Sequence, residues 1–112
     1  MSTESNIRET DNGFEVRIDL GGFEQCLLCA SLVDAEALGR MGELTKAYVD
    51  LLRADAEDGA RPKPEQIDDL IRGFESARAA LVRVGYEIVV SMIDSKLTWL
   101  RQTRARVVSE GG

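Results

Sequence analysis

Two cysteines, Cys26 and Cys29, are the side chains whose type and spacing first suggest chemistry in this sequence. Cysteines three positions apart occur in metal-binding and redox sites. A metal site of the usual kind needs about four ligands, and this sequence contains no histidine and no third cysteine. In a strand, the two thiols would also point to opposite faces, because side chains alternate with a period of two. We therefore predict two ordinary buried thiols, with no bound metal or other cofactor.

General acid–base catalysis also lacks its usual residues. Histidine, the commonest catalytic base near neutral pH, is absent from the sequence. The hydroxyls of Ser91 and Ser95 lie in a helical pattern without an evident base beside them. The acids of segment 55–58 are close in sequence, but such neighbours rarely converge on one point. We predict that the protein is not an enzyme.

The tetrapeptide Gly39-Arg40-Met41-Gly42 resembles the GxxG loop of KH domains, which contacts the backbone of single-stranded nucleic acid. The resemblance covers these four residues, and the residues around them are acidic. We favour a helix whose glycines allow a neighbouring element to pack closely. No residue role is transferred from that family.

The formal net charge of the chain is −6, and acids outnumber basic residues in its N-terminal two-thirds. Surplus negative charge disfavours non-specific binding to nucleic acid and to anionic membranes, because both are themselves negative. It favours instead a protein partner with a basic surface. The acids that we predict to contact such a partner are Asp11, Asp19, Glu24, Asp55, Glu57 and Asp58.

Residues 14–20 alternate apolar and charged side chains, which is the pattern of a strand with one buried face. Gly21-Gly22 supplies a two-residue hairpin turn, after which residues 23–30 return antiparallel. This register includes the cross-strand pairs Phe14–Cys29, Val16–Leu27, Ile18–Gln25 and Asp19–Glu24. The alternative interpretation makes residues 23–30 the start of a helix. The polar residues 1–12 predict a flexible leader.

Apolar residues at steps of three and four predict two long helices after the hairpin. The first, 34–54, begins at Asp34, which is a good N-cap residue. The segment 55–64 ends it, and the second helix, 64–84, has a proline in its first turn. A single glycine costs a helix only about 1 kcal/mol relative to alanine, so we favour a continuous or gently kinked helix through Gly85 over a break there.

The C-terminal stretch 86–108 predicts a long helix with more apolar surface than one small domain readily covers. The alternative for residues 86–92 is a strand, because three consecutive residues there are β-branched. The apolar residues that we assign to a homodimer interface are Leu28, Ile88, Met92 and Trp99. The basic residues that are candidates for contact with nucleic acid are Arg101, Arg104 and Arg106.

These patterns predict one α+β domain, residues 13–112, with an N-terminal β-hairpin, two or three long helices, and the long C-terminal helix as core. We favour a small acidic inhibitor or adaptor that occupies a basic surface, of the kind that binds nucleic acid, on a larger partner. In size and charge it resembles anti-CRISPR proteins as a class, without a shared motif. The alternatives are a homo-oligomeric structural or assembly-chaperone protein and a nucleic-acid binder. Because no apolar run is long enough to span a bilayer and the N-terminus is polar, we expect a cytoplasmic protein.

Overall fold

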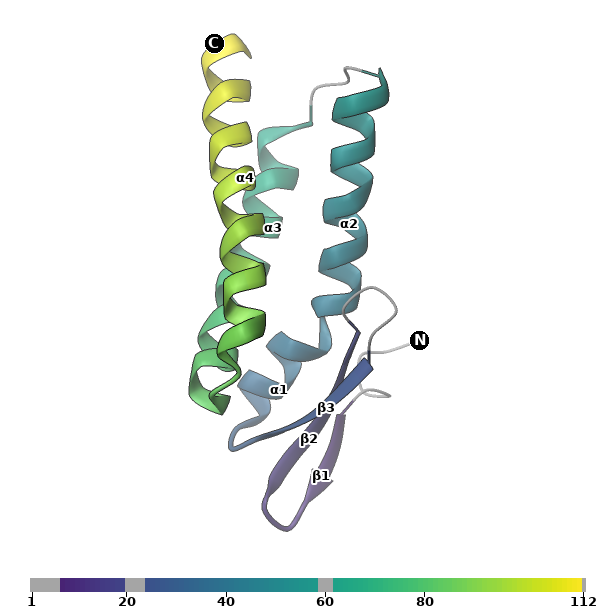
Figure 1. Ribbon diagram of the computed structural model, residues 1–112, viewed down its shortest axis with the longest axis vertical. Helices are drawn as coiled ribbons and strands as arrows, with labels where there is room; N and C mark the ends of the chain where they lie inside the picture. Colours follow the sequence, from purple (N-terminus) through teal and green to yellow (C-terminus); the bar gives the residue numbers. More distant parts are fainter. Residues whose placement is uncertain (1–6, 20–23, 59–61, 112) are drawn as a thin grey trace.

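The computed structural model describes residues 7–19, 24–58 and 62–111, apart from the side chains of Asp19, Glu57, Asp58 and Glu110. These residues form an α+β fold in which a small sheet is followed by long helices (Figure 1). In chain order the elements are β1 (Ile7–Thr10), β2 (Gly13–Asp19), β3 (Glu24–Cys29), α1 (Leu32–Gly39), α2 (Met41–Arg53), the π-helix η2 (Ala54–Asp58), α3 (Pro64–Val84) and α4 (Glu87–Gly111). None of the described helices combines the length and apolar character needed to cross a membrane.

The three strands form one antiparallel sheet in the order β1-β2-β3. Between β2 and β3 the structure confirms the predicted pairs Phe14–Cys29, Val16–Leu27, Ile18–Gln25 and Asp19–Glu24. The predicted Gly21-Gly22 turn lies outside the described residues. At the start of β2, Gly13 has a φ of 142°, and a Cβ there would lie 2.3 Å from the carbonyl oxygen of Cys29. Glycine is therefore required at this position.

Strand β1 lies within the segment that we predicted to be a flexible leader, so that prediction is wrong from Ile7 onward. Ile7 pairs with Val16 of β2 and packs against the core. The guanidinium of Arg8 donates a hydrogen bond to the carboxylate of Glu15, 3.0 Å away. A short edge strand needs little apolar pattern of its own, because β2 supplies its backbone hydrogen-bond partners. Residues 1–6 of the predicted leader lie outside the described part of the chain.

The first predicted helix is divided in two and begins earlier than expected. Ser31 is the N-cap of α1, since its hydroxyl accepts a hydrogen bond from the backbone N–H of Asp34 at 3.2 Å. The helix breaks at Arg40, between Gly39 and Gly42, where the two glycines lower helix propensity. The break lets α1 pack on β2 and α3 while α2 follows α3 further along the molecule (Figure 1).

The carboxylate of Asp34, which we predicted to be the N-cap, is instead held by Arg83 near the end of α3. Asp34 is only 7% exposed, and it accepts hydrogen bonds from both arms of this guanidinium, with Nε 2.8 Å from Oδ2. These hydrogen bonds hold the pKa of Asp34 below its ordinary value. The pair fixes the start of α1 against the far end of α3, 49 positions later in the chain.

The prediction of a continuous helix through Gly85 is wrong. Gly85 ends α3 in the left-handed conformation, with a φ of 84°, and its N–H donates to the carbonyl oxygen of Leu81 at 2.9 Å. The N–H of Tyr86 donates to the same oxygen at 3.0 Å, which completes the cap. The chain then reverses, so α3 and α4 lie antiparallel (Figure 1). Helix α4 is helical from Glu87 onward, which excludes the alternative of a strand at residues 86–92.

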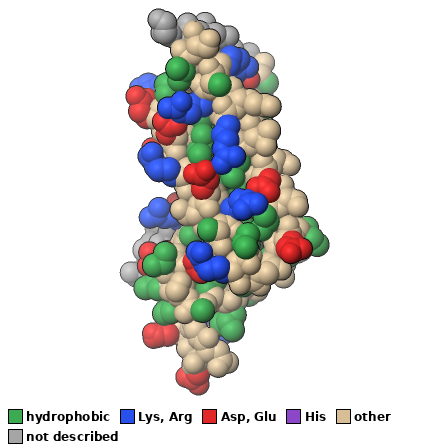
Figure 2. All heavy atoms as spheres, turned by 90° about the vertical axis from the view of Figure 1, so that its left-hand side faces the viewer, with side chains coloured by type: hydrophobic (Ala, Val, Ile, Leu, Met, Phe, Trp, Pro, Cys, Tyr) green, Lys and Arg blue, Asp and Glu red, His purple; other side chains and the backbone are tan. Residues whose placement is uncertain are grey.

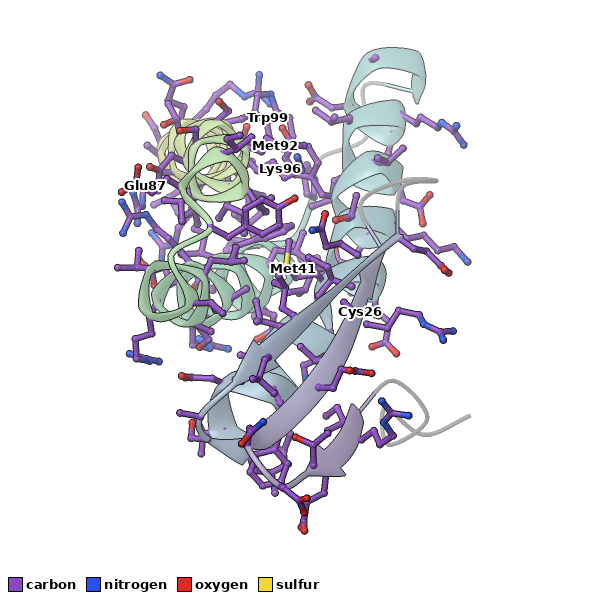
Figure 3. All side chains as sticks on the ribbon, turned by 60° about the horizontal axis from the view of Figure 1, so that its bottom comes forward. Cys26, Met41, Glu87, Met92, Lys96 and Trp99 are labelled. Atoms are coloured by element: carbon purple, nitrogen blue, oxygen red, sulfur yellow. The ribbon has the colours of Figure 1, made fainter. Side chains whose placement is uncertain are left out.

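The core lies between α3, α4, α1 and the inner face of the sheet. Phe74 of α3 is fully buried at its centre, and Met41 at the start of α2 lies between the sheet and the helices (Figure 3). The buried side chains of α4 are Val89, Val90, Ile93, Leu97, Leu100, Thr103 and Val107. The prediction that the C-terminal helix forms the core is therefore confirmed.

Candidate protein-binding groove

Cys26 and Cys29 point to opposite faces of β3 and do not lie together in one site. Side chains alternate along β3, so Cys29 is buried whereas Cys26 is exposed, and the prediction of two buried thiols is wrong for Cys26. Burial raises the pKa of the Cys29 thiol, and the negative charge of Asp34 raises it further. Within the described residues, no group of three or more cysteines and acids is placed to hold a metal ion.

The arginines that we considered for nucleic-acid contact all lie beside carboxylates. Arg101 of α4 donates a hydrogen bond to Glu75 of α3 at 2.7 Å. Arg104, about one turn later on α4, donates a hydrogen bond to Asp68, about two turns earlier on α3. Figure 2 shows basic and acidic side chains interspersed on the face that α3 and α4 form. The hydrogen bond from Arg104 holds the pKa of Asp68 below its ordinary value. The positive charge of α4 is thus largely neutralised within the chain.

The third arginine, Arg106, links α4 to the π-helix. Its guanidinium donates to the carboxylate of Asp55 at 2.9 Å, so this predicted partner-binding acid already has a basic neighbour. Glu57 and Asp58 lie in the same element, and their side chains are outside the described part of the structure.

The remaining predicted acids lie on the sheet, far from η2. Asp11 is exposed in the turn between β1 and β2. Asp19 and Glu24 pair across β2 and β3 at the opposite end of the sheet. Figure 1 places η2 at the other end of the molecule, whose longest extent is 51 Å. The structure therefore does not bring the predicted acids together into one site.

The residues of the predicted homodimer interface are likewise distributed over two elements, β3 and α4. Leu28 is on the outer face of the sheet and 49% exposed, whereas Ile88 and Met92 are on the first turns of α4 and are 74% and 42% exposed. Trp99 packs edge to face against Tyr48 of α2, with ring centroids 5.5 Å apart. Lys96 lies over the same tyrosine ring, 5.6 Å from its centroid (Figure 3). Trp99 therefore serves to join α4 to α2.

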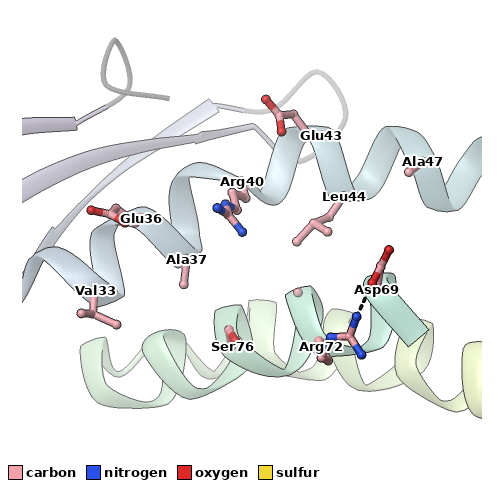
Figure 4. Close-up of a pocket in the computed structure, with 11 residues that line it drawn as sticks. Val33, Glu36, Ala37, Arg40, Glu43, Leu44, Ala47, Asp69, Arg72 and Ser76 are labelled. Carbon is pink, nitrogen blue, oxygen red and sulfur yellow. Dashed lines mark hydrogen bonds and ion pairs between the residues drawn. The ribbon is translucent and has the colours of Figure 1, made fainter. Parts of the chain in front are cut away.

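A hollow between α1 and α2 on one side and α3 on the other forms an open groove (Figure 4). Its volume is about 760 Å³. Val33, Ala37 and Leu44 point from α1 and α2 towards α3. Val33 is 76% exposed, although it is an apolar side chain at the end of the groove. We call this hollow the α2–α3 groove.

Small side chains form much of the floor of the α2–α3 groove. Ala37 and Ala47 line it from one side, and Gly73 and Ser76 line it from α3. A Cβ at Gly73 would lie 2.6 Å from a methyl group of Leu44, so glycine lets this leucine rest directly on the α3 backbone. These residues give the floor small and mostly apolar side chains.

A second hollow of about 550 Å³ continues the groove along α2. It shares Ala47 and Asp69 with the first hollow and extends past Leu51 to Pro62. The α2–α3 groove therefore follows nearly the whole length of α2. Such an elongated and mostly apolar depression has the shape of a docking site for another polypeptide.

Three exposed acids border the groove on the side of α1 and α2. Glu36, Glu43 and Asp50 recur at intervals of seven residues and all line one of the two hollows. None of them makes an ion pair with another described residue. We call these three residues the acidic rim.

Basic side chains enter the groove at two points. Arg72 of α3 pairs with Asp69 one turn earlier on the same helix (Figure 4). Arg40, at the break between α1 and α2, points into the groove between Glu36 and Glu43. The sum of the charged side chains that line the two hollows is four acids against two arginines, which leaves the groove negative.

Sequence reasoning did not find the acidic rim. The signal that was present is the seven-residue spacing of these acids, which places Glu43 and Asp50 on one face of α2, while Glu36 lies on α1. Comparison of the chain with protein-family models, curated proteins and solved structures finds no match. The fold and the groove define the molecule as a small acidic α+β protein with an open, elongated groove.

Proposed function

We propose that this protein acts by binding another protein without catalysis, as a small acidic inhibitor or adaptor that occupies a basic surface of a larger partner. The observation that carries the proposal is the acidic rim. Its three carboxylates border an apolar groove and have no described basic partner, while the arginines of the opposite face are paired. The groove supplies apolar contact area and the rim supplies charge.

Unpaired surface carboxylates act on an approaching partner over roughly a Debye length, about 8 Å at physiological salt. They attract a basic surface and accelerate its association, and the apolar groove then stabilises the complex. A basic surface that normally holds nucleic acid fits this description, because its positive charges are already exposed and arranged for an anionic ligand. A protein seated on such a surface would exclude the nucleic acid, and this exclusion is the inhibitory action that we propose.

The test begins with capture of partners from the source cells on the immobilised full chain. Each captured protein is then purified, and its dissociation constant is measured by calorimetry at low and high salt. We expect affinity to fall with rising salt and to fall further in the variant E36Q/E43Q/D50N, which neutralises the acidic rim.

The matched control is E9Q/E65Q/E87Q, which removes the same number of charges from exposed acids that lie outside the groove and outside the predicted partner-binding set. The affinity of this variant for the same partner should change by less than about twofold, since its substitutions are distant from the proposed interface. An equal loss of affinity in both variants would show that the partner is held by non-specific charge attraction. If every captured partner binds the variant E36Q/E43Q/D50N as tightly as the wild-type chain, the proposed function is wrong.

A second candidate function, self-association as a structural or assembly-chaperone protein, is favoured by the exposed apolar residues of α4. Ile88 is 74% exposed and Met92 is 42% exposed. Light scattering at low and high salt distinguishes the two functions. A stable dimer that survives high salt and dissociates in the variant I88E/M92E would favour self-association, because apolar contacts are not screened by salt.

A further inference from the structure

We infer that the α2–α3 groove receives an α-helix of the partner, amphipathic, with small and apolar residues along one face and Lys or Arg beside them every seven residues. This inference rests on the proposed function and specifies the element that is bound. It follows from the chemistry of the floor, the spacing of the rim and the position of one arginine.

The uncharged part of the groove offers few hydrogen-bonding groups. Ala37, Leu44, Ala47 and Gly73 present apolar surface, and the hydroxyl of Ser76 is the one uncharged polar side chain among the residues that line the larger hollow. An extended peptide on this apolar part would bury backbone N–H and C=O groups without partners, at a cost of roughly 1–3 kcal/mol for each group. A helix satisfies its own backbone and leaves the charged side chains of the groove to its own side chains, so a helix lies there at lower cost than an extended peptide.

The spacing of the rim agrees with a helix that runs along the groove. Residues seven apart on a helix are about 10.5 Å apart along its axis and lie on nearly the same face. Glu43 and Asp50 have this spacing on α2, while Glu36 lies on α1, before the break at Arg40. A partner helix that lies alongside α2 would therefore present one basic residue to each of Glu43 and Asp50 if its own basic residues recur every seven positions.

The size of the groove also agrees with a helical ligand. Helix α2 has 13 residues, which corresponds to a length of about 20 Å. The two hollows together reach from Val33 of α1, along α2, to Pro62 before α3. Three heptads of a partner helix are about 30 Å long and would extend by about one turn beyond each end of α2.

The positive charge of Arg40 provides a test in which binding should become stronger instead of weaker. Its guanidinium points into the groove between Glu36 and Glu43 and makes no ion pair with a described residue. It therefore repels a basic ligand that both acids attract. Removal of this positive charge should strengthen the binding of a basic helix, whereas removal of the neighbouring acids should weaken it.

The probe for the experiment is a synthetic peptide of about 21 residues, three heptads, with Ala and Leu along one face and Arg at every seventh position. A first control peptide has the same sequence with two central residues replaced by proline, which prevents a continuous helix. A second control peptide keeps the composition but moves the arginines to the face opposite the apolar stripe. Binding to the full chain is measured by fluorescence anisotropy, and helix formation by circular dichroism.

We expect the helical probe to bind and to gain helicity, and both control peptides to bind at least tenfold more weakly, which corresponds to about 1.4 kcal/mol. The variant E36Q/E43Q/D50N should weaken the probe by roughly fivefold to thirtyfold, if each rim charge contributes as an exposed ion pair does. The variant R40Q should strengthen it by up to about fivefold on the same basis. Ala47→Trp, which fills the middle of the groove, should abolish binding, and E9Q/E65Q/E87Q should change it by less than about twofold.

The outcomes separate this inference from the proposed function. If the proline peptide binds as tightly as the helical one and both depend on the rim, the helical ligand is wrong and the acidic protein-binding role stands. If the probe binds equally to wild type and to the Ala47→Trp variant, the groove is not the docking site. If the probe fails to bind at roughly 1 mM, the inferred helix is wrong. If the variant E36Q/E43Q/D50N binds both the probe and the captured partners as tightly as wild type does, both proposals are wrong.

Discussion

On the face formed by α3 and α4, arginines lie beside carboxylates of a neighbouring element, whereas the three acids of the acidic rim make no ion pair with a described residue. Arg101 and Glu75 on the first face are 2.7 Å apart. The field of each paired charge is reduced by the opposite charge beside it, while the field of the acidic rim extends into solvent. The same residue types thus hold the fold together on one face and remain accessible on the other.

Two consecutive acids of α3, both paired, lie on different faces of the molecule. Asp68 pairs with Arg104 across the α3–α4 face, and Asp69 pairs with Arg72 on the groove side of α3. Because helical neighbours differ in direction by about 100°, adjacent acids serve different surfaces. A count of charges along the sequence therefore indicates the net charge of the protein but not which surface is free to bind.

The largest expected effect tests whether the α3–α4 face is primarily structural. Leu97 of α4 is 1% exposed, and Leu97→Ala should reduce the free energy of unfolding by about 2–5 kcal/mol, because a buried leucine leaves a cavity. Ile88→Ala, on the same helix at 74% exposure, should change it by less than about 0.5 kcal/mol. Guanidinium unfolding followed by circular dichroism measures both. Equal losses for the two variants would show that Ile88 is buried in a dimer.

The next effect concerns the pair that joins α1 to α3. Asp34→Ala should reduce the free energy of unfolding by about 2 kcal/mol, since it removes charged hydrogen bonds of a buried carboxylate. The same measurement on Glu36→Ala, at an exposed position two residues later, is the control, with an expected change of less than about 0.5 kcal/mol. Equal stability of the two variants would mean that the Asp34–Arg83 pair does not hold α1 in place.

Much of the fold follows from local sequence patterns. The alternation of residues 14–19 indicates which face of β2 is buried, and the register that a two-residue turn predicts agrees with the observed pairs between β2 and β3. The helix that begins at Pro64 is equally local, because proline and the following apolar steps mark its start. These predictions succeed because each depends on residues that are adjacent in the sequence.

Other features depend on tertiary packing and could not be predicted in the same way. The cost of one glycine in a helix favoured continuity at Gly85, but the reversal there buries the apolar seams of α3 and α4 against each other, which outweighs that cost. The partner of Arg106 is 51 positions away, and nothing near either residue indicates the pair. The α2–α3 groove likewise exists only once α1, α2 and α3 are packed together.

Acid should affect the paired face through its carboxylates. Hydrogen bonds from Arg104 and Arg78 hold the pKa values of Asp68 and Asp94, respectively, below their ordinary range. A carboxyl group with a lowered folded-state pKa stabilises the fold above its unfolded pKa of about 3.9, and this stabilisation is lost as the pH falls through the folded pKa. The midpoint of guanidinium unfolding should therefore decrease below about pH 4, and less steeply in the variant D68N/D94N than in wild type.

The smallest expected effect sharpens the comparison between the two faces. Asp68→Arg alone should lower the unfolding midpoint slightly, since it places two cations side by side, and the exchange D68R/R104D should restore most of the loss. Because net charge and the acidic rim are unchanged in the exchange variant, binding of the helical probe should equal that of wild type. Calorimetry of the probe and guanidinium unfolding together measure both results. An exchange variant that regains stability but loses the probe would show that the α3–α4 face contributes to binding, and the separation of a structural face from a binding face would fail.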